Sequence, residues 1–130
     1  MVNTATRHST YKTSVPNNIA IVDPFSKLVA FLRMDNAFLG SVDISIKKAE
    51  ASVLFNGIPN YALYTRAQPG GDLYGIEETN DVIVLFGGGQ PIYDSHGYFI
   101  GAIGVSGGTV QQDINSATAG ANAVGFTISA

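Results

Sequence analysis

Glycine is the residue whose placement most restricts the fold of this chain of 130 residues. None of the fifteen glycines precedes Gly40, and most of them lie between Gly87 and Gly125. Gly101 and Gly104 fall within an apolar stretch that has the pattern of a strand, where glycine indicates a bulge or the close approach of another backbone or a ligand. We therefore expect short strands and tight turns in the second half of the chain.

The composition indicates one globular domain. Apolar residues make up 45% of the chain and charged residues 13%, against about 25% charged residues in a typical domain. A chain of this composition is not expected to be disordered. Much of it should be buried in a core or an interface.

The composition also excludes several classes of protein. The chain has no cysteine, which excludes disulfide scaffolds, thiolate metal sites, iron–sulfur clusters and cysteine nucleophiles. His8 and His96 are its two histidines, so a histidine-rich metal site within one chain is excluded. The net charge is −3 and no long basic run occurs, so neither nucleic acid nor an anionic membrane is expected as a partner.

Targeting segments are not evident in the sequence. The polar residues 1–14 lack the apolar stretch of a signal peptide, and no apolar run is long enough to span a bilayer. We therefore expect a soluble, cytoplasmic protein.

The chain is expected to consist of a polar lead-in, residues 1–17, and a single domain, residues 18–130. The lead-in should be frayed or form the end of a short helix. Asn18–Asp23 and Leu28–Met34 are predicted to form an antiparallel hairpin. A helix is predicted from Gly40 to the Asn56-Gly57 stop signal. Its apolar stripe consists of Val42, Ile46, Ala49 and Val53.

The second half is predicted to contain strands followed by a helix. Residues 60–81 are expected to be loop. Val82–Phe86 is predicted to be a buried strand, followed by strands at Gln90–Tyr93 and Tyr98–Val105. Thr109 and Gln112 have the spacing of a capping box, which marks the start of the last helix.

The order of these elements predicts an α+β fold. Hairpins with tight turns imply antiparallel strands. We expect an antiparallel sheet of about five strands with helices packed on one face. The other face should be partly apolar, and a subunit interface could cover it, which predicts a homo-oligomer.

An ordered set of motifs runs through residues 16–125. NIAIVD is followed by LVAFLRMDNAFLGSVDISIKKA, QPGGDLYGIE, FGGGQPI and GAIGVSGGTVQQD. This order resembles the haem-degrading or haem-binding-like family, also called the HbpS/GlcG-like family; RMD, QPGG, FGGG and GAIGVSGGT carry the resemblance most specifically. The resemblance implies a profilin-like fold, assembly into oligomers, and haem as the candidate cofactor.

The chain departs from this family in two respects. Family members usually carry a full amphipathic helix before the first strand, whereas residues 1–17 are short and polar here. No histidine lies within the shared motifs, because His8 is in the lead-in and His96 is at a predicted turn. The usual imidazole ligand of haem is therefore not obvious.

The glycine-rich loops are candidate ligand-binding segments. Their backbone amides could converge on a carboxylate, phenolate or enolate oxygen, and the last loop precedes a helix N-terminus. Alternatively, they are only tight turns between strands. The pattern GxGxxG and the P-loop pattern are both absent, so no nucleotide is expected. The candidate residues are Gly70, Gly71, Gly87, Gly88, Gly89, Ser106, Gly107, Gly108 and Thr109.

Four charged residues are candidate catalytic groups. Asp35 could be a general acid or base, and Arg33 could hold an anionic group. Glu77 or Glu78 could enter a pocket beside Tyr74 and transfer protons. The alternative is that these residues shape a connection or place charge at a helix N-terminus.

Other side chains have simpler interpretations. Asp43, Lys47 and Lys48 are expected to form a solvated helix face with one ion pair. The aromatic residues that could line a cavity for an aromatic ligand are Tyr61, Tyr64, Tyr74, Phe86, Tyr93, Tyr98 and Phe99.

Two functions of different classes follow. The first is a small-molecule-binding protein of the haem-binding-like family, with a tetrapyrrole as the ligand that the resemblance implies. The second is a cofactor-independent isomerase, cyclase or lyase that uses carboxylate acid–base chemistry on a small organic substrate, with aromatic compounds among the candidates. A structural oligomer without a ligand is a third possibility.

Overall fold

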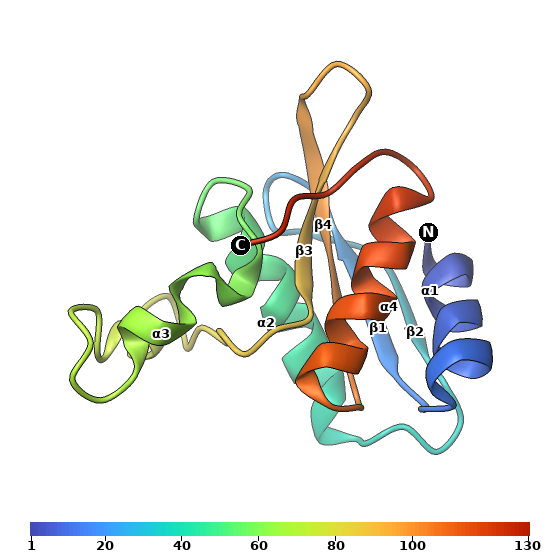
Figure 1. Ribbon diagram of the computed structural model, residues 1–130, viewed down its shortest axis with the longest axis horizontal. Coiled ribbons are helices and arrows are strands. Elements are labelled where there is room, and N and C mark those ends of the chain that lie inside the picture. The colour runs from blue at the N-terminus through green and yellow to red at the C-terminus, as the bar shows by residue number, and fades with distance from the viewer.

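A computed structural model describes residues 1–130 and has a four-stranded antiparallel sheet at its centre (Figure 1). The strands are β1 (Asn18–Val22), β2 (Leu28–Arg33), β3 (Gly89–Tyr93) and β4 (Phe99–Ser106). They lie in the order β2-β1-β4-β3, so each predicted hairpin is formed and β1 pairs with β4 between them. The α+β class and the antiparallel sheet are confirmed.

Helices cover both faces of this sheet, so the expectation of helices on one face is wrong. Helix α2 (Gly40–Leu54) packs on one face, and α1 (Val2–His8) and α4 (Val110–Asn122) pack on the other (Figure 1). The reason is that β1 is buried on both sides. Ile19 and Ile21 contact the core beneath α1 and α4, whereas Val22 contacts Ala49 of α2.

The expected polar lead-in is instead a helix packed on the domain. Helix α1 continues into a π-helical turn, η1 (Ser9–Thr13). Ala5 is fully buried against α4, where Gly120 allows the two helices to approach closely. The sequence shows little of this because one alanine, with the partly buried Met1 and Val2, makes the apolar contact.

Residues 82–86 are not a strand, so the sheet has four strands rather than about five. The segment is extended, and Ile83 and Leu85 are buried beside Ala51 and Ala67. Its backbone bonds to a side chain instead of a neighbouring strand: Asn60 Nδ2 donates to the carbonyls of Val84 and Phe86. An apolar run alone does not distinguish these two arrangements.

Residues 60–81, expected as loop, contain three short helical segments that form an arm beside α2 (Figure 1). They are η2 (Asn60–Leu63), α3 (Tyr64–Ala67) and η3 (Ile76–Glu78). The exposed Arg66 and Asp72 pair across the arm with a distance of 2.8 Å between Nη2 and Oδ2.

Helix α2 presents small residues to the sheet, and of its predicted apolar stripe only Ala49 is fully buried. Ser45 and Ser52 are fully buried, whereas Val42, Ile46 and Val53 are half-buried. Gly104 explains this: an added Cβ would lie 1.9 Å from the carbonyl oxygen of Ser45. The helix backbone therefore lies directly on the strand, and larger side chains must point sideways.

The predicted ends of the elements are formed as expected. Thr109 accepts from the amide of Gln112, whose side chain accepts from the amide of Thr109, so the capping box is confirmed. Asp23 Oδ1 accepts from the amides of Phe25 and Lys27 in the first hairpin turn. None of the helices has the length and apolar character that crossing a membrane requires.

Replacement of Gly104 by alanine should lower the free energy of unfolding by about 2–3 kcal/mol, because the new methyl group meets the backbone of α2. Gly40→Ala is the matched control, since no atom lies within 4 Å of its Cβ position; it should change stability by less than about 0.5 kcal/mol. Urea unfolding measures both, and equal effects would contradict the close packing of α2.

Candidate functional site

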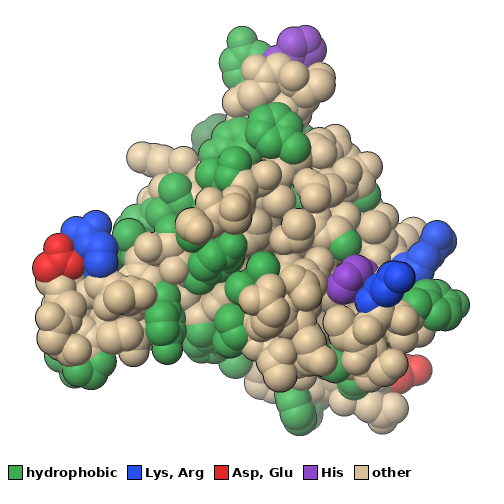
Figure 2. Space-filling model, viewed as in Figure 1, with side chains coloured by type: hydrophobic (Ala, Val, Ile, Leu, Met, Phe, Trp, Pro, Cys, Tyr) green, Lys and Arg blue, Asp and Glu red, His purple; other side chains and the backbone are tan.

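A surface on α1 and α4 gathers a histidine, two cations and an aromatic ring. We call it the His8 patch; it is a shallow hollow of about 260 Å³ lined by Thr4, Arg7, His8, Tyr11, Lys12 and Ala119. Figure 2 shows a histidine on this side of the molecule next to lysine and arginine side chains. The hollow exists because the lead-in is helical, which places residues four apart on one face.

Ser116 of α4 holds the ring of His8. Nδ1 of His8 lies 3.1 Å from Oγ of Ser116, which also accepts from the hydroxyl of Ser9 at 3.2 Å. Nδ2 of Asn17 in turn donates to Ser9 Oγ at 2.8 Å. When Nδ1–H donates to Ser116, Nε2 keeps its lone pair, which is the form that binds a metal centre.

The cations beside His8 are not paired. Arg7 and Lys12 are exposed and take part in none of the ion pairs of the chain. Tyr11 beside them is also exposed. The patch therefore offers one imidazole, an apolar ring and two positive charges to a ligand.

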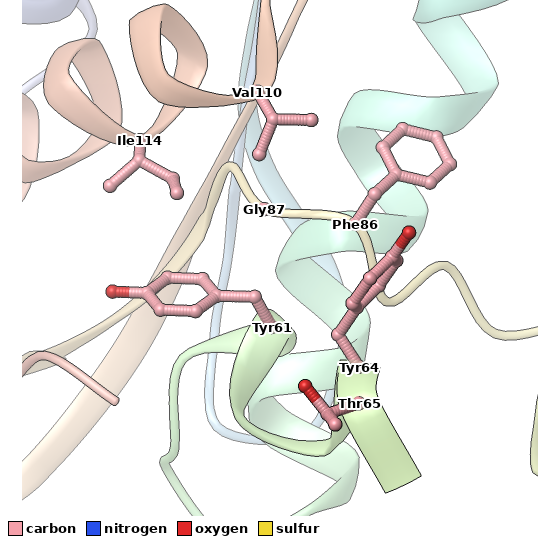
Figure 3. Close-up of a pocket in the computed structure, with 7 residues that line it drawn as sticks. All are labelled: Tyr61, Tyr64, Thr65, Phe86, Gly87, Val110 and Ile114. Atoms are coloured by element: carbon pink, nitrogen blue, oxygen red, sulfur yellow. The ribbon is translucent and has the colours of Figure 1, made fainter. Parts of the chain in front are cut away.

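A second hollow, the aromatic cleft, lies between the arm and α4 (Figure 3). Its volume is about 380 Å³. Tyr61, Tyr64 and Phe86, which the sequence suggested as cavity residues, line it. The remaining lining residues are Thr65, Gly87, Val110 and Ile114. Gly87 lies against Ile114: an added Cβ would lie 2.5 Å from its Cδ1, so the side chain of Ile114 would have to shift.

A buried ion pair lies behind the aromatic cleft. Lys48 is fully buried, contrary to the predicted solvated face, and its Nζ lies 3.0 Å from Oδ2 of Asp113 and 2.9 Å from the carbonyl oxygen of Val105. The ring of Phe86 covers the ammonium, with its centroid 5.0 Å from Nζ. Burial lowers the pKa of Lys48 from its ordinary value, and the charge and hydrogen bond of Asp113 oppose this shift. The other expected pair, Asp43 with Lys47, is formed on the surface.

The amides of the predicted glycine loops are used within the protein. Gly89 donates to Oδ1 of Asn60, Gly108 donates to Oδ1 of Asp113, and Gly71 donates to the carbonyl of Gln68. Around them, Gly88 lies against Lys48 and Gly107 lies against Asn17. The hydroxyl of Ser106 bonds to the hydroxyl of Ser41. Thr109 caps the N-terminus of α4. These residues position α2 and α4 and do not line one common ligand pocket.

The predicted acid–base residues are not brought together. Arg33 and Asp35 are exposed at the end of β2, and Asp35 lines a polar hollow beside Asn36 and the end of η1. Glu77 and Glu78 lie in the arm, where Glu78 is exposed. In the same arm, Gly70 and Tyr74 are exposed as well. No hollow contains both groups of carboxylates.

Sequence reasoning missed His8 as a site residue, together with its partner Ser116. The available signal was the face of small residues on α4, which includes Ala117, Gly120 and Ala121 and can accept a closely packed helix. Combined with the polar lead-in, that face could have indicated α1.

The chain matches known proteins along most of its length. A family model described as haem-degrading protein HbpS-like matches residues 1–122. An uncharacterised 15.0 kDa protein in the dhaT–dhaS intergenic region of Citrobacter freundii is 45% identical over 77% of this chain and 70% of its own length. The corrinoid adenosyltransferase PduO of the same organism is 36% identical over 79% of this chain, which spans only 30% of PduO.

Solved structures agree with this result. A crystal structure of a PduOC–haem complex has a TM-score of 0.86 and 32% identity, covering 95% of this chain and 88% of that one. The protein ORFY of Klebsiella pneumoniae has a TM-score of 0.85 and 36% identity over 93% of this chain and 82% of its own. HbpS has a TM-score of 0.83 and 25% identity, and the match covers 95% of this chain and 84% of the HbpS chain.

Replacement of Lys48 by methionine should lower the free energy of unfolding by about 3–5 kcal/mol, because the carboxylate of Asp113 would remain buried without its partner. Lys47→Met breaks only the exposed pair with Asp43 and should cost less than about 1 kcal/mol. Urea unfolding at neutral pH compares them. Similar losses in both variants would contradict the burial of Lys48.

Proposed function

The chain belongs to the haem-degrading HbpS-like family, and from this premise we propose that it is a tetrapyrrole-binding protein that holds haem at the His8 patch. The observation that carries the proposal is the imidazole of His8, fixed by Ser116 through Nδ1 and flanked by two unpaired cations. It supplies the imidazole that the motifs resembling the family do not contain.

The residues of the patch fit the parts of haem. Nε2 of His8 is a suitable donor to iron, and the hydrogen bond to Ser116 orients the ring. Arg7 and Lys12 would attract the carboxylate groups of the porphyrin, and Tyr11 and Ala119 would contact its apolar surface. When bound, haem would supply an iron centre for redox or gas-binding chemistry.

The aromatic cleft is a poorer haem site. It offers phenol oxygens and no imidazole, and no cation lines it. His96 is no substitute, because it lies in an exposed turn where its amide donates to the carboxylate of Asp94. The alternative function, a cofactor-independent enzyme, is not supported, because the carboxylates of Asp35 and of Glu77 and Glu78 lie in separate places.

We also propose that a second copy of the chain covers exposed apolar surface. The edge strand β2 leaves Leu28 and Val29 exposed, and Phe25 in the preceding turn is 82% exposed. An unpaired edge with apolar side chains is a suitable surface for self-association.

His8→Ala should weaken haem binding by about 100-fold or more and remove the Soret shift of the bound form, because the iron loses its nitrogen ligand. Ser116→Ala should weaken binding by about tenfold, since the imidazole loses its orienting partner. A spectral titration with hemin measures both. His96→Ala is the matched control and should bind as the unchanged protein does; a loss of binding in this variant alone would contradict the site.

Reversal of both charges in an Arg7→Glu, Lys12→Glu variant should weaken haem binding by about tenfold at low salt, because the carboxylates of haem would meet like charges. The difference from the unchanged protein should shrink at high salt. A Lys27→Glu, Arg33→Glu variant, at two exposed positions of the first hairpin, changes the net charge by the same amount and is the control. An equal effect of that control would indicate that only the net charge matters.

A further inference from the structure

A polar compartment adjoins the aromatic cleft. It has a volume of about 320 Å³ and shares Tyr61 and Ile114 with the cleft, so the two are neighbours along α4. Both volumes lie in the range of about 300–1,000 Å³ that small-molecule sites occupy. None of its lining residues is charged, and the other polar side chains along its wall are Gln90, Gln111, Thr118, Asn122, Thr127 and Ser129.

Gln90 in the wall of this compartment has an unused hydrogen-bond acceptor. Its side chain is 1% exposed, and Nε2 donates to Oγ1 of Thr127 and to the carbonyl oxygen of Ile128, each at 3.0 Å. A carbonyl oxygen can only accept, so the contact with Ile128 fixes which end of the amide is the nitrogen. Oε1 has almost no accessible surface and no partner in the protein, so the side chain of Gln90 must shift before a ligand donor can reach it. Buried polar atoms are rarely left in this state, so a donor is missing.

The aromatic cleft supplies the other half of a binding site. In Figure 3, the ring of Tyr61 lies beneath Ile114, and its hydroxyl points away from Phe86 and Tyr64. The ring of Phe86 stands between the cleft and the ammonium of Lys48. The cleft is therefore aromatic and uncharged, which suits a flat apolar ring.

We propose that the cleft and the polar compartment form one binding site for a neutral aromatic molecule that carries an N–H or O–H donor. The ring would lie between the aromatic side chains, and the donor would reach Oε1 of Gln90 past Tyr61 and Ile114. An anionic group would be rejected, because it would face the oxygen of Gln90 and no cation lines the site. This site is separate from the His8 patch and does not depend on haem binding.

Benzamide and benzoate test the proposal, because they have nearly the same shape but only the amide is neutral and has a donor. Both are titrated into the full chain, followed by amide chemical shifts. Benzamide should bind at least about tenfold more tightly than benzoate, with the shifts concentrated at Gln90, Ile114 and Thr127. Equal binding of the two compounds, or shifts located elsewhere, would overturn the proposal.

Variants on α4 separate this site from the His8 patch. Thr118→Trp should fill the polar compartment and abolish benzamide binding while hemin binding persists, because Thr118 is half-exposed and lines only that compartment. Ala119→Trp should do the reverse, because Ala119 lines the His8 patch. Gln90→Met should reduce the preference for benzamide by about tenfold. If Gln90→Met does not fold, Thr118→Trp still tests the proposal. Benzamide binding that survives in Thr118→Trp would overturn it.

Discussion

The ion pair between Lys48 and Asp113 is the interaction on which the arrangement of this molecule depends. The two residues belong to α2 and α4, which lie on opposite faces of the sheet. The ammonium of Lys48 can reach the carboxylate because Gly88 has no side chain; an added Cβ would lie 2.7 Å from Nζ. The pair thus connects the two helical layers at the end where β3 begins.

The desolvation of these charges is offset by other contacts. Lys48 also donates to the carbonyl of Val105 and lies against the ring of Phe86, while Asp113 accepts from the amide of Gly108. Each of these contacts holds a glycine-rich connection of the chain in place. The pair is therefore best described as a device that positions backbone, since a buried pair seldom adds net stability over an apolar replacement.

Helix α4 forms a wall of both proposed ligand sites. Ser116 and Ala119 face α1 and the His8 patch, whereas Ile114 and Thr118 face the aromatic cleft and the polar compartment. Residues at these positions point in different directions because successive residues rotate by about 100° around the axis. One rigid helix can therefore serve two ligands of different chemistry, provided that the ion pair holds it in place.

The sequence by itself determined the local elements of this protein. The two hairpins, helix α2 and the capping box of α4 follow from turn residues, periodicity and a cap, which act over a few neighbouring positions. The aromatic residues of the cleft were only partly recognisable, because three of the seven candidates, Tyr61, Tyr64 and Phe86, line it and the other four lie elsewhere.

Only the tertiary structure decided which surfaces meet. The burial of Lys48 depends on Gly88 and Asp113, 40 and 65 residues further along the chain, and no local pattern encodes that. Residues 82–86 pair with no strand, and the side chain of Asn60 donates to the carbonyls of Val84 and Phe86 instead. His8 became a candidate site residue because α1 packs on a face of small residues on α4. The local sequence is compatible with several arrangements, and long-range contacts of this kind determine which one forms.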